Sequence, residues 1–220
     1  MIKAIVFDLD GTLLNTLESI GNAFNRSLQK MDMPVHEIDS YRYFIGDGVF
    51  NCARRCLPSK HSNEKNITKL VEIERLDYAR SWKVDAQPYD GIQALLDSAQ
   101  GAGYRLAVLT NKDDVFAQQC VRHFFPTTIF DCVVGHSSGV PHKPDPTGGF
   151  LIAGHLGLAT CELAMIGDTS IDIHTAQACN MFSVGVLWGF REIIELEEAG
   201  ADRIIGHPGQ LLDILVNKSI

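Results

Sequence analysis

Five short runs of apolar residues, each ended by a turn or helix signal, constrain most strongly what this chain can fold into. Runs this short and without polar alternation indicate strands that are buried on both faces, and such strands belong to parallel sheets. In chain order the runs are Ile2 to Leu9, Leu106 to Thr110, Phe130 to Val134, Leu163 to Ile166 and Val184 to Leu187. The sequence therefore predicts a parallel sheet with a buried centre.

Helical patterns separate the later runs. One of them begins after Asp90, which we expect to be its N-cap, and places Ile92, Leu95, Leu96 and Ala99 on one face at the 3.6-residue period. Alternating strands and helices are typical of an α/β fold with a doubly wound, Rossmann-like parallel sheet.

The first crossover is far longer than a strand-helix-strand unit needs, because nearly a hundred residues separate Leu9 from Leu106. Two apolar stripes with a helical period lie in this interval: Leu17, Ile20, Phe24, Leu28 and Met31 in the first, and Ile67, Leu70, Val71 and Tyr78 in the second. We predict a helical domain over residues 15–86, inserted into an α/β core domain formed by residues 1–14 and 87–220.

The charge of the chain excludes several classes of partner. Its 220 residues include 19 Lys and Arg against 27 Asp and Glu, a formal charge of −8, which argues against a nucleic acid polymer or an anionic membrane as partner. No apolar run approaches the roughly 18 residues of a membrane span, and Asp8 and Asp10 interrupt the apolar N-terminal stretch, which is unlike a signal peptide. The six cysteines lack the paired spacing of a zinc site, so we expect a reduced, cytoplasmic protein.

Polar residues follow the predicted strands at the points where these end. In open α/β sheets, ligands bind beyond the carboxyl ends of the strands, so these residues are the candidates for chemistry. They are Asp8 and Asp10 after the first run, Thr110, Asn111 and Lys112 after the second, Lys143 after the third, and Asp168 and Asp172 after the fourth.

Several carboxylates at one sheet edge repel one another and would repel a phosphate unless a cation intervened. A ligand set of oxygen atoms only favours Mg²⁺. If the first strand continues far enough, Asp8 and Asp10 face the same side, so that one can bond covalently to phosphorus while the other handles protons. Lys112 or Lys143 would offset the charge of the transferring oxygens, and the Thr110 hydroxyl would hold them.

Four ordered motifs of this sequence resemble those of the haloacid dehalogenase superfamily: Asp8-Leu9-Asp10-Gly11-Thr12, Thr110-Asn111-Lys112, Lys143-Pro144 and Gly167-Asp168-Thr169-x-x-Asp172. The resemblance implies Asp8 as nucleophile and metal ligand, and Asp10 as acid and base with its carbonyl on the metal. It implies Thr110 and Asn111 on the phosphoryl group, Lys143 as the neutralising lysine, Asp168 as metal ligand, and Asp172 as ligand or support. We assign Gly11 and Lys112, with Asn111, to substrate binding.

The inserted helical domain stands where that superfamily has its cap, whose closure excludes water. Within the superfamily the chain is most similar to phosphoglycolate phosphatases, in residues 44–48, 186–191 and 199–202. The resemblance thus implies a Mg²⁺-dependent phosphatase for a small phosphorylated metabolite, working through an aspartyl phosphate as a monomer or homodimer.

Other reactions stay open at this point. Relatives within the superfamily hydrolyse pyrophosphate or nucleotides, and a phosphomutase shares the same motifs. A serine esterase is the remote alternative, because Gly135-His136-Ser137-Ser138-Gly139 fits a nucleophile elbow, with Asp168 and His207 downstream. Pro141, Pro144 and Pro146 then follow where the elbow needs a helix, which argues against this alternative.

Overall fold

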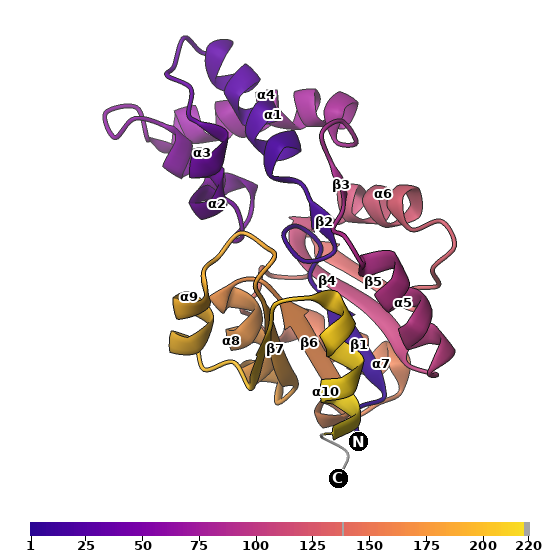
Figure 1. Cartoon of the computed structure of the whole chain (residues 1–220). Helices are drawn as coiled ribbons and strands as arrows, with labels where there is room; N and C mark the ends of the chain where they lie inside the picture. Colours follow the sequence, from indigo (N-terminus) through magenta and orange to yellow (C-terminus); the bar gives the residue numbers. More distant parts are fainter. Residues whose placement is uncertain (138, 218–220) are drawn as a thin grey trace.

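A computed structural model describes residues 1–137 and 139–217 of the chain. Within these residues six parallel strands form one sheet, in the order β5-β4-β1-β6-β7-β8 (Figure 1). The strands are β1 (Ala4–Phe7), β4 (Arg105–Asp113), β5 (Cys132–His136), β6 (Leu163–Gly167), β7 (Phe182–Val186) and β8 (Arg203–Ile205). The predicted doubly wound parallel sheet is confirmed, although the edge strand β8 was missed because three residues carry too short an apolar signal.

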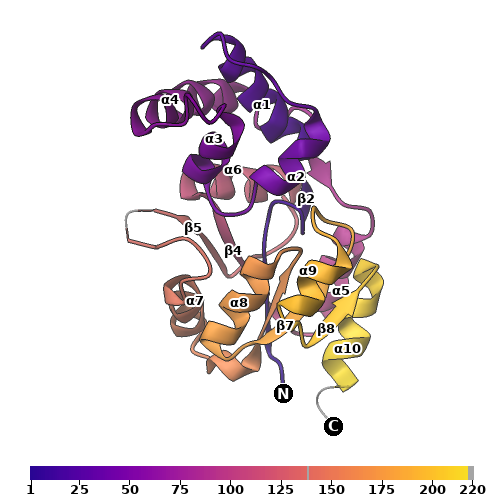
Figure 2. The ribbon, with the colours of Figure 1, turned by 90° about the vertical axis from the view of Figure 1, so that its left-hand side faces the viewer.

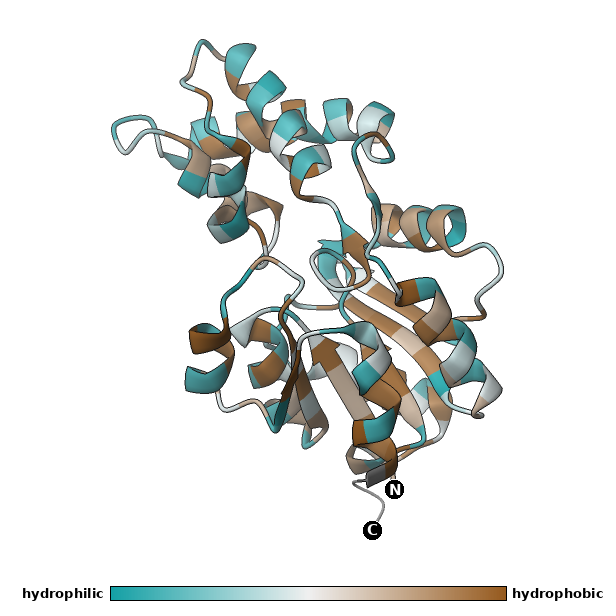
Figure 3. Ribbon diagram, in the orientation of Figure 1, coloured by the Kyte–Doolittle hydropathy of each residue, from teal (hydrophilic) through white to brown (hydrophobic). Residues whose placement is uncertain are grey.

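Helices cover both faces of the sheet. All four residues of β1 are apolar because the strand is buried on both faces. Ile5 and Phe7 point into a core shared with α5 (Ile92–Gly101), α6 (Asp114–Phe124) and α10 (Leu211–Asn217). Ala4 and Val6 point the other way, toward α7 (Thr147–Leu156) and α8 (Ser170–Cys179), and α9 (Ile193–Glu198) packs on α8. The hydrophobic colouring is accordingly concentrated on the central strands in Figure 3.

Two local predictions were wrong. Strand β1 ends at Phe7 rather than Leu9, because the chain turns sharply at Gly11, whose φ is +91° and whose N–H donates to the Leu14 carbonyl at 2.9 Å. The N-cap of α5 is Gly91 rather than Asp90, because Gly91 takes a left-handed conformation with φ +83° that favours glycine.

The long first crossover forms a helical layer of its own. It leaves the core through β2 (Leu14–Asn15) and returns through β3 (Gln87–Pro88), and these two strands pair antiparallel. Between them lie α1 (Leu17–Gln29), a 3₁₀ turn (Ile38–Ser40), α2 (Tyr41–Phe44), α3 (Val49–Cys56) and α4 (Glu64–Ser81). Figures 1 and 2 show these helices as a separate layer above the sheet.

This helical layer has its own core, in which Phe24, Leu28, Tyr41 and Leu70 are fully or almost fully buried. The two apolar stripes predicted from the sequence lie on α1 and α4, apart from Met31, which follows the end of α1. Over residues 1–137 and 139–217, no helix is long and apolar enough to span a membrane.

Candidate active site

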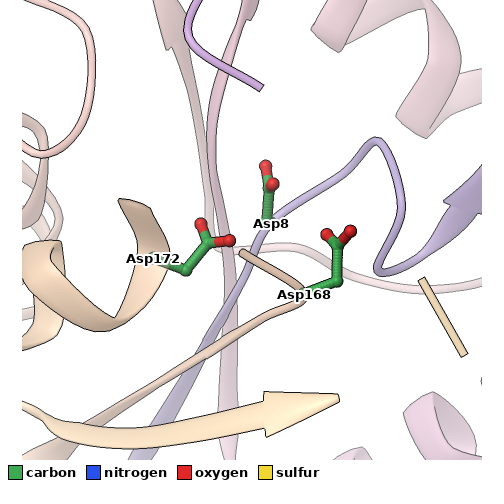
Figure 4. Close-up of side chains that lie close together, drawn as sticks. All are labelled: Asp8, Asp168 and Asp172. Carbon is green, nitrogen blue, oxygen red and sulfur yellow. The ribbon is translucent and has the colours of Figure 1, made fainter. Parts of the chain in front are cut away.

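Three carboxylates meet at the carboxyl ends of the central strands. Asp8 follows β1, Asp168 follows β6, and Asp172 lies in the first turn of α8. Each is buried and offers an oxygen, and these oxygens all lie within 4.8 Å of one another (Figure 4). Three buried carboxylates this close need a positive charge between them, and oxygen donors without nitrogen or sulfur fit Mg²⁺. The chemistry of this donor set therefore fits the divalent ion predicted from the sequence.

Neighbouring donors hold two of these carboxylates in place. Asp172 accepts hydrogen bonds from the Thr169 N–H at 3.1 Å and the Thr169 hydroxyl at 2.9 Å, in a capping box that starts α8. Asp168 accepts from the Thr12 hydroxyl at 3.1 Å and from the Phe190 N–H at 2.8 Å. The sequence assigns no role to Thr12 or Phe190, since neither is an ionisable residue at a strand end.

Lys143 supplies a positive charge to this cluster. Its buried ammonium lies 2.9 Å from Asp8 Oδ1 and 2.6 Å from Asp172 Oδ1. Burial alone would lower the pKa of Lys143, but the adjacent Asp172 and Asp8 carboxylates outweigh it and raise that pKa. Lys143 is therefore a permanent cation beside Asp8. Its role as the lysine that neutralises a phosphoryl group stays a prediction.

Asn111 holds the main chain that carries Lys143. Its Oδ1 accepts from the Lys143 N–H at 2.6 Å, while its Nδ2 donates to the Lys143 carbonyl at 3.1 Å and to the Gly46 carbonyl at 2.9 Å. The side chain thus joins the core to the loop between α2 and α3. The Asn111 amide is thus already hydrogen-bonded to main-chain groups. Its predicted contact with substrate stays a prediction.

Asp10 stands apart from the three clustered carboxylates. Both of its oxygens accept from the Lys112 ammonium at 3.0 Å, and Oδ1 also accepts from the Thr16 hydroxyl at 2.8 Å. Lys112 is buried and its ammonium also lies 4.8 Å from the centre of the Tyr78 ring. The side chain of Asp10 is therefore oriented by Lys112 and Thr16, which leaves only its carbonyl for the predicted metal contact.

Gly11 and Thr110 complete the predicted set. A Cβ atom on Gly11 would lie 2.6 Å from Asp168 Oδ1, so the positive φ and this close approach explain the glycine. Thr110 is buried and lines the pocket, and its Oγ1 accepts from the Lys112 N–H at 3.3 Å. A contact of Gly11 or Thr110 with substrate stays a prediction.

A pocket of about 80 Å³ lies between the sheet edge and the helical layer. The core contributes Asp8, Asp10, Thr110, Asn111, Lys112, Asp113 and Phe116, and the helical layer contributes Ile20, Phe24, Ile45, Gly46, Gly48, Val49, Cys52, Glu74, Arg75 and Tyr78. One water molecule needs roughly 10–15 Å³ of cavity volume, so the pocket has room for a phosphate and a small group attached to it.

The clustered carboxylates make the metal-free protein sensitive to pH. Burial, with the neighbouring Asp172 and Asp8 charges, raises the pKa of Asp168 to about 8. Burial also raises the pKa of Asp8 to about 7, although Lys143 opposes this shift. Between the ordinary pKa of 3.8 and these values the folded state binds protons that the unfolded state has lost, so stability falls as pH rises.

We therefore expect the melting temperature in EDTA to fall by at least roughly 10 °C between about pH 5.5 and pH 8. Because an ion bound by the carboxylates stabilises only the folded state, millimolar Mg²⁺ should flatten this slope. Circular dichroism melts at several pH values, with and without Mg²⁺, measure the effect. Parallel slopes in the two conditions would contradict a metal site at these residues.

Comparison with known proteins places the chain in a family. The family model described as haloacid dehalogenase-like hydrolase matches residues 5–186, a stretch that includes all the clustered carboxylates. The chain belongs to the haloacid dehalogenase-like hydrolases. This confirms the resemblance seen in the four sequence motifs.

Among these hydrolases the chain is similar to proteins named phosphoglycolate phosphatase. The one from Colwellia psychrerythraea is 27% identical over 203 residues, which is 90% of each chain, and the one from Neisseria meningitidis is 29% identical and covers 98% of this chain and 93% of its own. A solved structure of a haloacid dehalogenase-like family hydrolase from Streptococcus pneumoniae superposes with a TM-score of 0.88 at 28% identity, covering 97% of this chain and 98% of its own.

Proposed function

We propose that this chain is a Mg²⁺-dependent phosphatase, similar to phosphoglycolate phosphatases, which hydrolyses a small phosphate monoester through a phosphorylated Asp8. The observation that carries the proposal is the clustering of Asp8, Asp168 and Asp172 around one point, with Lys143 bridging Asp8 and Asp172. Membership of a hydrolase family and the names of the relatives support it.

Asp8 and Asp168, with the Asp10 carbonyl and Asp172 nearby, would hold the ion. When bound, the ion would neutralise phosphate oxygens that the carboxylates otherwise repel. An oxygen of Asp8 forms a bond to phosphorus as the bond from phosphorus to the ester oxygen breaks, and Asp10 gives that oxygen a proton. Lys143 and Thr110 hold the transferring oxygens.

In the second half of the reaction Asp10 acts as a base instead of an acid. Asp10 accepts a proton from a water molecule, whose oxygen bonds to phosphorus while the bond from phosphorus to Asp8 breaks. The products are inorganic phosphate and free Asp8. Lys112 and Thr16 keep the Asp10 carboxylate at one place throughout, because they bind it from two sides.

The proposal divides the chain into two domains. Residues 1–14 and 87–220 would form the catalytic domain, and residues 15–86 the cap, whose approach excludes bulk water from the pocket. The small pocket supports a small phosphorylated metabolite as partner rather than a polymer. A cytoplasmic location and a monomeric or homodimeric state complete the proposal, and the free thiols of all six cysteines are compatible with a reducing compartment.

The serine esterase alternative has no support in the backbone around Ser137. Ser137 forms an antiparallel bridge with Val140, and α7 begins only at Thr147, whereas a nucleophile elbow requires a helix directly after the serine. Ser138, the fourth residue of that motif, lies outside the described residues. A pyrophosphatase, nucleotidase or phosphomutase would use the same site and is distinguished by substrate and product.

Removal of the metal tests the proposal. We expect EDTA to lower Mg²⁺-supported phosphate release by at least about a hundredfold, since the ion stabilises transition-state charge by several kcal/mol, and added Mg²⁺ should restore the rate. The assay measures phosphate released from phosphoglycolate, pyrophosphate and nucleoside monophosphates, with Ser137→Ala as a variant that keeps full activity. An EDTA-resistant activity that Ser137→Ala removes would support the esterase instead, and an isomerised ester without free phosphate would identify a mutase.

A further inference from the structure

The cap side of the pocket contains a buried carboxyl group that the proposed chemistry does not use. Glu74 lies on α4 among the residues that line the pocket and is only 4% exposed. Among residues 1–137 and 139–217, no side-chain hydrogen bond or ion pair involves it. Burial raises the pKa of Glu74 to about 8, even though Lys112 opposes the shift. A carboxyl group so placed costs free energy unless a donor reaches it.

Tyr78 lies one helical turn after Glu74, on the same face of α4, and also lines the pocket. Its hydroxyl is buried beside the Lys112 ammonium and forms no hydrogen bond of standard geometry in the described part of the chain, so its O–H has no acceptor there. Two neighbouring polar groups of one helix thus border the same pocket with unused hydrogen-bonding capacity. In folded proteins such groups are rare and call for a partner, which here can come from the ligand.

The cations that line this pocket are already paired with carboxylates. Lys112 donates to both oxygens of Asp10 at 3.0 Å, and Arg75 lies 2.7 Å from Asp113. Most other side chains on the cap wall are apolar: Ile20, Phe24, Ile45, Val49 and Cys52. The lining therefore offers no free positive charge for a second anionic group of the substrate, which would also be repelled by Glu74 once that carboxyl group is ionised.

On the basis of the proposed phosphatase function, we propose that Glu74 and Tyr78 form a subsite for the alcohol part of the ester. The subsite favours small phosphate monoesters whose alcohol part carries a hydroxyl or ammonium donor, and it disfavours those with a second anionic group. Glu74 accepts from the donor, and Tyr78 adds a hydrogen bond. Phosphoglycolate would then be hydrolysed less efficiently than its uncharged analogue, 2-hydroxyethyl phosphate.

Three esters of similar size and different charge test this subsite: phosphoglycolate, 2-hydroxyethyl phosphate and phosphoethanolamine. At about pH 8.5 the Glu74 carboxylate is largely ionised. We expect wild-type kcat/KM for the two donor-bearing esters to exceed that for phosphoglycolate by about tenfold, because like charges several ångströms apart in a partly buried pocket repel on this scale. Glu74→Gln should reduce this preference by about tenfold.

Glu72→Gln is the matched control, because Glu72 lies on the same helix but is exposed and does not line the pocket. It should leave all three kcat/KM values unchanged. Tyr78→Phe provides a second test that does not depend on Glu74→Gln folding. It should lower kcat/KM for 2-hydroxyethyl phosphate by about threefold to tenfold and leave phosphoglycolate nearly unaffected, since one hydrogen bond is lost.

p-Nitrophenyl phosphate separates failure of the subsite from failure of the phosphatase. If this ester is hydrolysed with Mg²⁺ but the substrate preference is the same in wild type, folded Glu74→Gln and Tyr78→Phe, the subsite is wrong and the phosphatase stands. If none of the four esters is hydrolysed, both proposals fail. A preference that shifts in both pocket variants and not in Glu72→Gln supports the subsite.

Discussion

Replacing Asp8 with asparagine is expected to lower phosphate release by about 10⁴-fold or more, because an amide cannot form the bond to phosphorus that a carboxylate forms. The fold should survive. Asparagine has nearly the same shape, its carbonyl oxygen can still accept from the Leu9 N–H, which lies 2.7 Å from Asp8 Oδ1, and Lys143 retains Asp172 as a partner. Phosphate release under saturating substrate and a thermal melt measure the two effects.

Asp97→Asn is the control for this substitution, because Asp97 is exposed on α5, far from the strand ends that carry the site. It should show the wild-type rate. Trapping of radioactive phosphate on the protein adds a direct readout, since label should bind covalently to wild type during turnover and not to Asp8→Asn. A normal rate in Asp8→Asn would rule out covalent catalysis by this residue.

Replacing Lys143 with methionine is expected to affect both catalysis and stability. The rate should fall by about 10²- to 10³-fold, which is typical of the loss of one electrostatic contact to the transition state. In EDTA the protein should also lose about 3–5 kcal/mol of stability, because Asp8 and Asp172 lose the buried cation that lies 2.9 Å and 2.6 Å from them. Steady-state kinetics with Mg²⁺ and urea unfolding in EDTA test the two expectations separately.

Lys112→Met is the comparison for Lys143→Met, since the Lys112 side chain is also buried at the site and binds Asp10 instead of the cluster. It should alter proton transfer through Asp10 and leave the Asp8 and Asp172 pairing intact. If Lys143→Met turns over normally while Lys112→Met does not, the role of neutralising the phosphoryl group passes to Lys112.

Some interactions at the site could not be read from sequence spacing. Asn111 follows the predicted strand over residues 106–110, so the sequence predicts it at the active edge, but β4 continues to Asp113 and includes Asn111. Its hydrogen bonds go to the main chain of Lys143 and Gly46. Asp10 is two residues from Asp8, but its carboxylate contacts Lys112 on β4 instead of joining the cluster. The side-chain rotamer decides the partners of Asn111, and the turn after β1 decides the partner of Asp10; neither leaves a periodic signal in the sequence.

The sequence by itself determined the buried parallel strands, the helical insertion and the edge of the sheet at which the polar residues gather. These follow from local patterns, because apolar runs must be covered on both faces and parallel strands end at a common edge. Only the tertiary structure decided that Asp8, Asp168 and Asp172 come within 4.8 Å of one another, and that Glu74 and Tyr78 of α4 line the same pocket as Asp8. Such contacts depend on how elements far apart in the chain pack together, and the free energy of that packing is spread over the whole core rather than encoded in any one segment.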